Sequence, residues 1–184
     1  MTEARSARQV LVLIDLQQGL VQGPPAVAHA DQLLATVGAL LARARAARVP
    51  VIFVEDEDVG PAGTVAGSTC AAVAPQAGER VLRKTACDAF HATDLLAHCH
   101  ALGATELVIA GCKTEACIDT TCRRATTLGL QVKLLADAHS TTDSPVLTAA
   151  QIIAHHQHVL DGFGCELEGE IYEIAVIPSA EVAW

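Results

Sequence analysis

Aromatic side chains are scarce in this 184-residue sequence: they make up 3% of the residues, whereas hydrophobic residues make up 51%. The core must therefore be built from Val, Leu, Ile and Ala, which is the composition of an α/β domain with a parallel sheet. The high apolar content excludes a disordered chain. The length suits one domain with its own core, and we expect residues 1–184 to form it.

Basic residues are also few, since 12 Lys and Arg stand against 21 Asp and Glu and leave a net charge of −9. Cations this few and this dispersed form no phosphate-binding surface, so neither nucleic acid nor an anionic membrane is expected as a partner. No apolar run approaches the ~20 residues of a membrane helix. The first residues resemble no signal peptide, and we expect a cytoplasmic protein.

Metal-binding and disulfide patterns are weak. The seven cysteines are odd in number and irregularly spaced, which does not predict a disulfide framework. Cys112, Cys117 and Cys122 do not follow a standard zinc spacing. The His-rich stretch 155–158 has no Cys or carboxylate partner beside it, so we expect a solvated or subunit-facing helix surface there. The sequence predicts no metal and no cofactor.

Short apolar runs alternate with helical patterns along the chain. Strands are expected at 10–14, 51–54, 81–83, 107–110, 131–136 and 174–177. Helices are expected at 31–47 with Asp31 as N-cap, from 93 or 94 to 103, at 115–128 with Thr114 as cap, and at 144–160 starting at Ser144 and Pro145. Residues 55–79 form a long loop of the kind that often has a function. The alternation predicts a three-layer α-β-α sandwich with a largely parallel, about six-stranded Rossmann-like sheet.

Ligands of such sheets lie beyond the carboxyl ends of the strands. Cys117 follows one such end, in the first turn of a helix, where unpaired backbone N–H groups and the helix dipole lower a thiol's pKa and can hold an oxyanion. Asp15 could take the thiol proton, and Lys84 could stabilise the thiolate. The alternative for Cys117 is a small buried core residue. The candidates at or just past strand ends are Asp15, Glu55, Lys84, Cys117 and Asp137.

Several motifs resemble the isochorismatase-like cysteine hydrolase superfamily, and the similarity spans about residues 9–180. They are Val-Leu-Ile-Asp-Leu-Gln-Gln-Gly at 12–19, Arg-Lys-Thr-x-x-x-x-Phe at 83–90, Ala-Gly-x-x-Thr-x-x-Cys at 110–117, and Asp137 with Ala138.

The resemblance implies a catalytic triad of Asp15, Lys84 and Cys117 that cleaves a C–N bond through a thioester. It also implies an oxyanion hole made by the backbone N–H groups of Lys113 and Cys117, and a cis peptide bond between Cys112 and Lys113. Family members form homodimers or homotetramers, so a homo-oligomer is expected. The substrate pocket is expected to involve Gln17, Glu55, Phe90 and Asp137.

Departures from relatives narrow the substrate class. Nicotinamidases carry Asp-x-His and a metal after the second strand, but this chain has Glu-Asp-Glu-Asp at 55–58. The pattern is closer to the metal-free amidase branch that includes streptothricin hydrolase, and it predicts a small-molecule amide or lactam as substrate. The alternatives are a nicotinamidase-type hydrolase, an isochorismatase-type hydrolase that works without the cysteine, and a catalytically silent binding module of the same fold.

Overall fold

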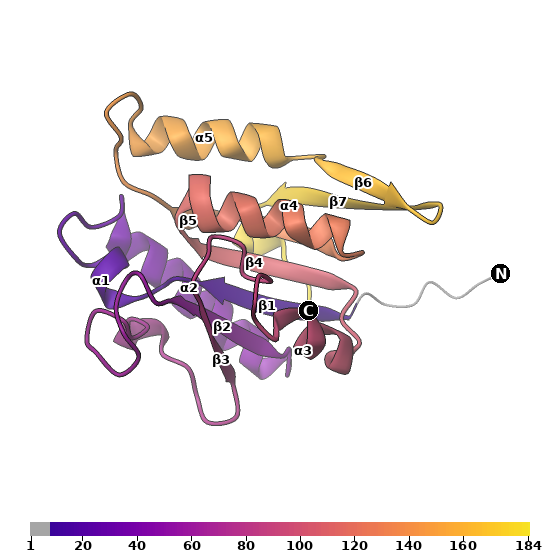
Figure 1. The fold of residues 1–184 in the computed structure, drawn as a ribbon, viewed down its shortest axis with the longest axis horizontal. Helices are drawn as coiled ribbons and strands as arrows, with labels where there is room; N and C mark the ends of the chain where they lie inside the picture. Colours follow the sequence, from indigo (N-terminus) through magenta and orange to yellow (C-terminus); the bar gives the residue numbers. More distant parts are fainter. Residues whose placement is uncertain (1–7) are drawn as a thin grey trace.

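The structure, a computed structural model, describes residues 8–184, and these residues form a seven-stranded sheet with helices on both faces (Figure 1). The strand order is β3-β2-β1-β4-β5-β7-β6, and every neighbouring pair is parallel except β6 with β7. The expected α/β sandwich is confirmed. The strands are β1 (Gln9–Ile14), β2 (Val51–Asp56), β3 (Arg80–Lys84), β4 (Glu106–Cys112), β5 (Gln131–Ser140), β6 (Gly164–Leu167) and β7 (Glu170–Ile177).

Helices α3, α4 and α5 pack on one face of the sheet and α2 on the other, so each strand in the centre is buried on both sides. Alternate residues of β1 therefore enter different cores, with Val12 facing α3 and α4 and Leu13 facing α2. The helices are α1 (Gln18–Val21), α2 (Ala30–Ala46), α3 (Leu95–Leu102), α4 (Asp119–Thr127) and α5 (Ala149–Leu160), with short turns η1 (Ala71–Val73), η2 (Thr114–Ile118) and η3 (Ser179–Glu181).

The hairpin of β6 and β7 was not predicted as two strands. Its connection consists of two residues, Glu168 and Gly169, which both have positive φ values, 54° and 87°. Two consecutive positive φ values match the right-handed twist of a tight hairpin, and glycine adopts such a φ at no steric cost. The Glu-Gly pair between alternating residues was therefore a signal for this seventh strand.

The predicted start of α5 at Ser144 and Pro145 was wrong. The helix begins at Ala149, because Thr148 and Gln151 form a capping box in which each side chain accepts from the other's backbone N–H. Ser144 instead closes a turn by accepting from the backbone of Leu147 at 2.9 Å. The N-cap prediction for α2 was also wrong, since Asp31 lies in the first turn and His29 is at the cap position.

Strand β5 is longer than predicted and contains a bulge. Ile109 of β4 pairs with Leu134 of β5, but Gly111, two residues later, pairs with His139, five residues later. The extra residues of β5 carry its end alongside the loop that follows β4. The predicted end at residue 136 therefore missed the segment of β5 that pairs with Gly111 and Cys112.

The structure also bears on disulfide bonds and on membrane-spanning helices. Within residues 8–184, all seven cysteines are free and none forms a disulfide. No helix in that same range is long and apolar enough to cross a membrane.

Candidate active site

Asp15, Lys84 and Cys117 come from three different parts of the sequence and meet at one edge of the sheet. Asp15 follows β1, Lys84 ends β3, and Cys117 lies in the turn η2 that follows β4. The Lys84 Nζ lies 2.9 Å from the Asp15 Oδ2 and donates to the Cys117 Sγ at 3.2 Å. The three residues are 1%, 1% and 7% exposed. The carboxyl ends of parallel strands share an edge, so side chains far apart in sequence converge there.

The backbone at this edge depends on Gly111 and Asp15. Gly111 pairs with Ile14 across the β1–β4 interface, and a Cβ at Gly111 would lie 1.9 Å from the Ile14 carbonyl oxygen. Gly111 also has a φ of +132°, a value that residues other than glycine rarely adopt. Asp15 follows with a φ of 52°, in the left-handed region that Asp tolerates better than most residues. Gly111 therefore permits the close approach of β1 and β4, and Asp15 changes the direction of the chain where β1 ends.

Asp56, at the end of β2, is a fourth member of the cluster that the sequence had not singled out. Its carboxylate Oδ2 accepts a hydrogen bond from the Lys84 Nζ, so Lys84 contacts two carboxylates and one sulfur. Glu55, the predicted pocket residue, points elsewhere: its carboxylate accepts from the Thr69 hydroxyl at 2.7 Å and pairs with Arg83 at 3.1 Å. Successive residues of a strand face opposite sides, and here the second acidic residue of the run faces Lys84.

Gln17 holds Asp56 in place rather than lining an open pocket. Its side-chain amide donates to the Asp56 carbonyl at 2.9 Å and accepts from the Asp56 N–H at 2.8 Å. The same nitrogen donates to the Gly67 carbonyl at 3.1 Å. Gln17 is completely buried, so the amide fixes the end of β2 and ties loop 55–79 to β1. The contribution of Gln17 to a substrate pocket stays a prediction, and its observed contacts hold the end of β2 beside the cluster.

Cys117 lies in a π-helical turn, η2, instead of in the first turn of an α-helix, and α4 begins two residues later. Thr114 does not cap this turn as predicted; its hydroxyl instead forms a 2.8 Å hydrogen bond with the His139 Nδ1. The backbone N–H groups of Ala116 and Ile118 both donate to the Lys113 carbonyl. The peptide bond between Cys112 and Lys113 is cis.

The charges of the cluster favour a neutral thiol, contrary to the prediction of a lowered thiol pKa. Burial raises the pKa of Cys117, the negative Asp15 raises it further, and Lys84 only partly opposes them. Burial opposes the charge of Lys84, but Asp15 and Asp56 outweigh it and raise the pKa of Lys84. One cation already faces two carboxylates here, and a thiolate would add a third negative group.

Asp15 is the group that titrates near neutral pH. Burial raises its pKa to about 6, against the opposing charge of Lys84. Its Oδ1 is buried and accepts no hydrogen bond from the residues that the structure describes. At pH 7 Asp15 is therefore mostly ionised, and one of its carboxylate oxygens lies within 4.8 Å of the Cys117 sulfur, an arrangement that permits general-base chemistry.

The other two predicted pocket residues, Phe90 and Asp137, lie in different surroundings. Phe90 is 9% exposed and belongs to the same hydrophobic core cluster as Cys117, and its part in a substrate pocket stays a prediction. Asp137 is exposed and its two carboxylate oxygens accept from the Ser179 N–H and hydroxyl, both at 2.7 Å. The contribution of Asp137 to a substrate pocket stays a prediction, and its carboxylate is engaged with Ser179 in this structure.

The donor set of Asp15, Asp56 and Cys117 has the composition of a metal site, with ligand atoms within 4.8 Å of one another. The Lys84 ammonium contacts each of these groups, so it holds the position at which their negative charge is concentrated. A metal ion in the same place would meet an existing positive charge. The geometry therefore fits an internal lysine as the cation of this cluster.

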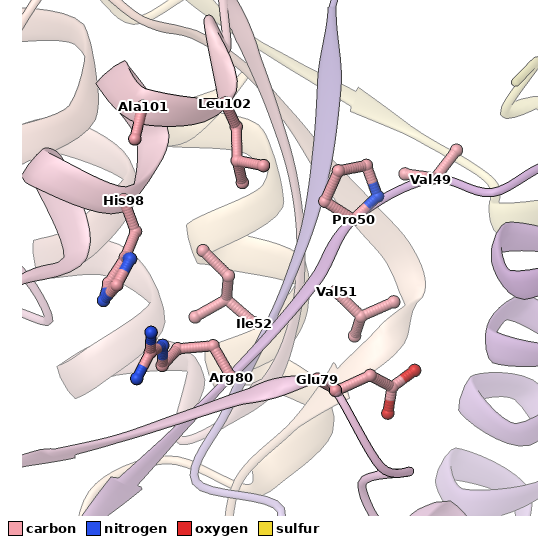
Figure 2. A pocket seen from close by; sticks show the side chains of 10 residues that line it. Val49, Pro50, Val51, Ile52, Glu79, Arg80, His98, Ala101 and Leu102 are labelled. Atoms are coloured by element: carbon pink, nitrogen blue, oxygen red, sulfur yellow. The ribbon is translucent and has the colours of Figure 1, made fainter.

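A separate cavity of about 340 Å³ lies at the opposite, amino end of β2 and β3 (Figure 2). Figure 2 shows His98 and Arg80 turned toward the same side of this cavity, whereas Glu79 points away. The Glu79 carboxylate pairs with Arg45 at 2.8 Å. The cavity shares no residue with the cluster around Cys117, and its lining is formed by residues 49–52 and 78–80 with His98, Ala101 and Leu102.

Comparison with known proteins identifies the family. The family model described as "Isochorismatase domain" matches residues 9–157. The chain belongs to the isochorismatase family. A crystal structure titled as an isochorismatase family protein superposes with a TM-score of 0.82 at 31% identity, over 92% of this chain and 97% of that one. The match includes every strand that contributes to the cluster around Cys117, so this cluster lies within the isochorismatase domain.

Two curated relatives are named as hydrolases. A streptothricin hydrolase of Streptomyces noursei is 39% identical over 142 residues, which is 74% of this chain and 51% of the relative. A maleamate amidohydrolase of Pseudomonas putida is 50% identical over 56 residues, 30% of this chain and 26% of the relative. The chain spans about half the length of the streptothricin hydrolases it matches.

Proposed function

We propose that this isochorismatase-family chain is a cysteine-dependent hydrolase that cleaves the amide or lactam C–N bond of a small molecule through a thioester. The observation that carries the proposal is the buried contact of Lys84 with Asp15 and with the Cys117 sulfur. The names of the streptothricin hydrolase and the maleamate amidohydrolase support amide chemistry. Burying charged groups is costly, and such clusters are common at functional sites.

The proposed first half-reaction transfers the thiol proton and forms a C–S bond. Asp15, ionised at neutral pH, takes the proton of Cys117 as the sulfur attacks the carbonyl carbon. The carbonyl oxygen becomes an oxyanion, for which the backbone N–H groups of Lys113 and Cys117 are the proposed donors. Asp15 then gives its proton to the leaving nitrogen, the C–N bond breaks, and an amine or ammonia leaves behind a thioester.

The second half-reaction returns the enzyme to its starting state. Asp15 is again a carboxylate and takes a proton from water as the water oxygen attacks the thioester carbon. The C–S bond then breaks, the sulfur takes back the proton, and the carboxylic acid product leaves. Lys84 remains protonated throughout, because Asp15 and Asp56 hold its pKa high. Its role is to balance the negative charge that passes between the carboxylate and the sulfur.

A comparison of Cys117→Ala with Cys122→Ala tests the proposal. Both residues are buried cysteines of the same segment, but Cys122 is completely buried in the core and forms no side-chain hydrogen bond with Asp15, Asp56 or Lys84 among the described residues. We expect release of amine or ammonia, measured on small amides that include maleamate, nicotinamide and a streptothricin-type lactam, to fall by at least about 10³-fold in Cys117→Ala. Cys122→Ala should keep turnover.

The covalent intermediate gives the decisive readout. Mass spectrometry of acid-quenched wild type with its substrate should show an acyl group on Cys117. Turnover that survives in Cys117→Ala would overturn the nucleophile assignment. No release from any amide, together with no acylation of Cys117 by an activated ester, would support a silent binding module of the same fold instead.

A further inference from the structure

The end of β5 contacts the turn that carries Cys117 almost residue by residue. Gly111 and Cys112 pair in the sheet with His139 and Ser140, and three side-chain hydrogen bonds continue the contact beyond β4. They join Lys113 Nζ to Thr142 Oγ1 at 3.1 Å, Glu115 Oε1 to Thr141 Oγ1 at 2.8 Å, and Thr114 Oγ1 to His139 Nδ1 at 2.8 Å. Of these, the bond of Thr114 with His139 is the buried one.

The contacts of Gln157 determine which nitrogen of His139 carries the proton. The Gln157 side-chain nitrogen donates to the Ala136 carbonyl at 2.7 Å, and since a carbonyl only accepts, the NH2 end of the amide faces His139. Its second hydrogen points to the His139 Nε2 at 3.1 Å, so that nitrogen must accept. The proton of the neutral ring is therefore on Nδ1, which donates to the Thr114 hydroxyl.

We propose that His139, held in the Nδ1–H tautomer by Gln157, is a positioning residue that fixes Thr114 and thereby the turn between Lys113 and Cys117. The inference rests on the proposed function, because the turn matters only if its backbone N–H groups receive an oxyanion. Thr114 is fully buried and lies directly after Lys113, so a displaced Thr114 would move both proposed donors. An oxyanion hole acts only if its donors are aimed before the reaction begins.

The surroundings of His139 keep this tautomer neutral. His139 is 4% exposed, and burial lowers its pKa to about 4. His156 of α5 lowers the pKa further, whereas Asp137 of β5 opposes this shift. At neutral pH the ring is uncharged, so it adds a directed hydrogen bond to the turn without changing the charge around Cys117.

Two reactions of Cys117 separate positioning from general stability. Acylation by p-nitrophenyl acetate passes through a tetrahedral oxyanion, but alkylation by iodoacetamide displaces iodide and forms none. If His139 aims the oxyanion donors, His139→Leu should slow acylation about 100-fold and change alkylation less than threefold. A merely structural role would change both rates together, through loss of the folded site.

His139→Asn is the matched variant. The Asn side-chain nitrogen lies about where Nδ1 lies in His, so it can donate to Thr114 while its shorter side chain gives up the contact with Gln157. We expect His139→Asn to recover acylation to within about tenfold of wild type. Equal acylation rates in wild type and His139→Leu, or no recovery in His139→Asn, would overturn the positioning role.

A measurement on the wild-type protein covers the case in which the variants fail to fold. Long-range ¹H–¹⁵N NMR of the imidazole should show a protonated Nδ1 and an unprotonated Nε2 for His139 at pH 7. The opposite tautomer, or an imidazolium, would contradict the proposal. Acylation of wild type that is equal in Cys117→Ala would instead overturn the proposed function, whereas a Cys117-dependent acylation that ignores His139 would overturn only the positioning role.

Discussion

Each end of β3 carries a basic side chain, which is buried at the carboxyl end of the sheet and exposed at the amino end. At the carboxyl end, Lys84 is almost completely buried against Asp15 and Asp56. At the amino end of the same β3, Arg80 is exposed at the edge of an open cavity (Figure 2). The amino end has the cavity of about 340 Å³ in Figure 2, whereas the carboxyl end has the buried charge.

Buried charge, rather than empty volume, supports the chemistry that we propose at Cys117. A buried ammonium that faces two carboxylates and a thiol interacts strongly with all three, because low dielectric strengthens every electrostatic interaction. The interactions of an exposed guanidinium at a cavity rim are weakened by the surrounding water and salt. We therefore place the chemistry at Cys117 and expect the amino-end cavity to be dispensable for it.

The largest expected contrast is between Lys84→Met and Arg80→Met, at the two ends of β3. Lys84→Met leaves Asp15 and Asp56 buried without their cation, which should cost roughly 3–5 kcal/mol of unfolding free energy and about 10³-fold in Cys117 acylation. Arg80→Met should change stability by less than about 0.5 kcal/mol. Urea unfolding at pH 7.5 and p-nitrophenyl acetate kinetics measure the two effects, and similar losses in both variants would remove the distinction between the two ends.

The second largest effect that we expect is the pH dependence of kcat/KM, which Asp15 at the carboxyl end of the sheet should cause. Asp15 must be ionised to accept the thiol proton, and its pKa is about 6, so kcat/KM should fall about tenfold per pH unit below pH 6. In Asp15→Asn this decrease of kcat/KM at acid pH should disappear, and the rate at pH 8 should be lower by about 10²–10⁴-fold.

Asp15→Asn should also change the pH at which iodoacetamide alkylates Cys117. Asp15 raises the pKa of Cys117, so its removal should shift the pH midpoint of iodoacetamide alkylation downward. Steady-state rates and alkylation rates between pH 4.5 and 10 measure both effects. An acid limb with a midpoint near pH 4, typical of an exposed carboxylate, would exclude Asp15 as a buried base.

The smallest effect is expected from filling the amino-end cavity. Ala101→Leu places a larger apolar side chain on a lining residue of the cavity in Figure 2. Acylation of Cys117 should stay within about twofold of wild type and stability within about 1 kcal/mol, since the added methylenes enter open space. A tenfold loss of acylation would mean that the two ends of the sheet are coupled.

Much of the fold and the centre of the site could be predicted from the sequence. Short apolar runs bounded by breakers located β1, β2 and β4, because strands buried on both faces need continuous apolar residues. The parallel order then placed Asp15, Lys84 and Cys117 at one edge, since connections between parallel strands return each chain to the same end. The capping box that starts α5 and the Glu-Gly turn before β7 were also readable signals, although the prediction missed both.

Other features were decided only by the tertiary structure. Whether Glu55 or Asp56 faces Lys84 depends on the pleat of β2, which a shift of one residue would reverse. The direction of the Cys117 pKa shift depends on how burial and the charges of Asp15 and Lys84 balance. The contact between Thr114 and His139 depends on a bulge in β5 that local sequence does not reveal. The sequence alone determined which residues reach the edge, because strand ends are local; their contacts and charges came from packing, because these depend on neighbours distant in the chain.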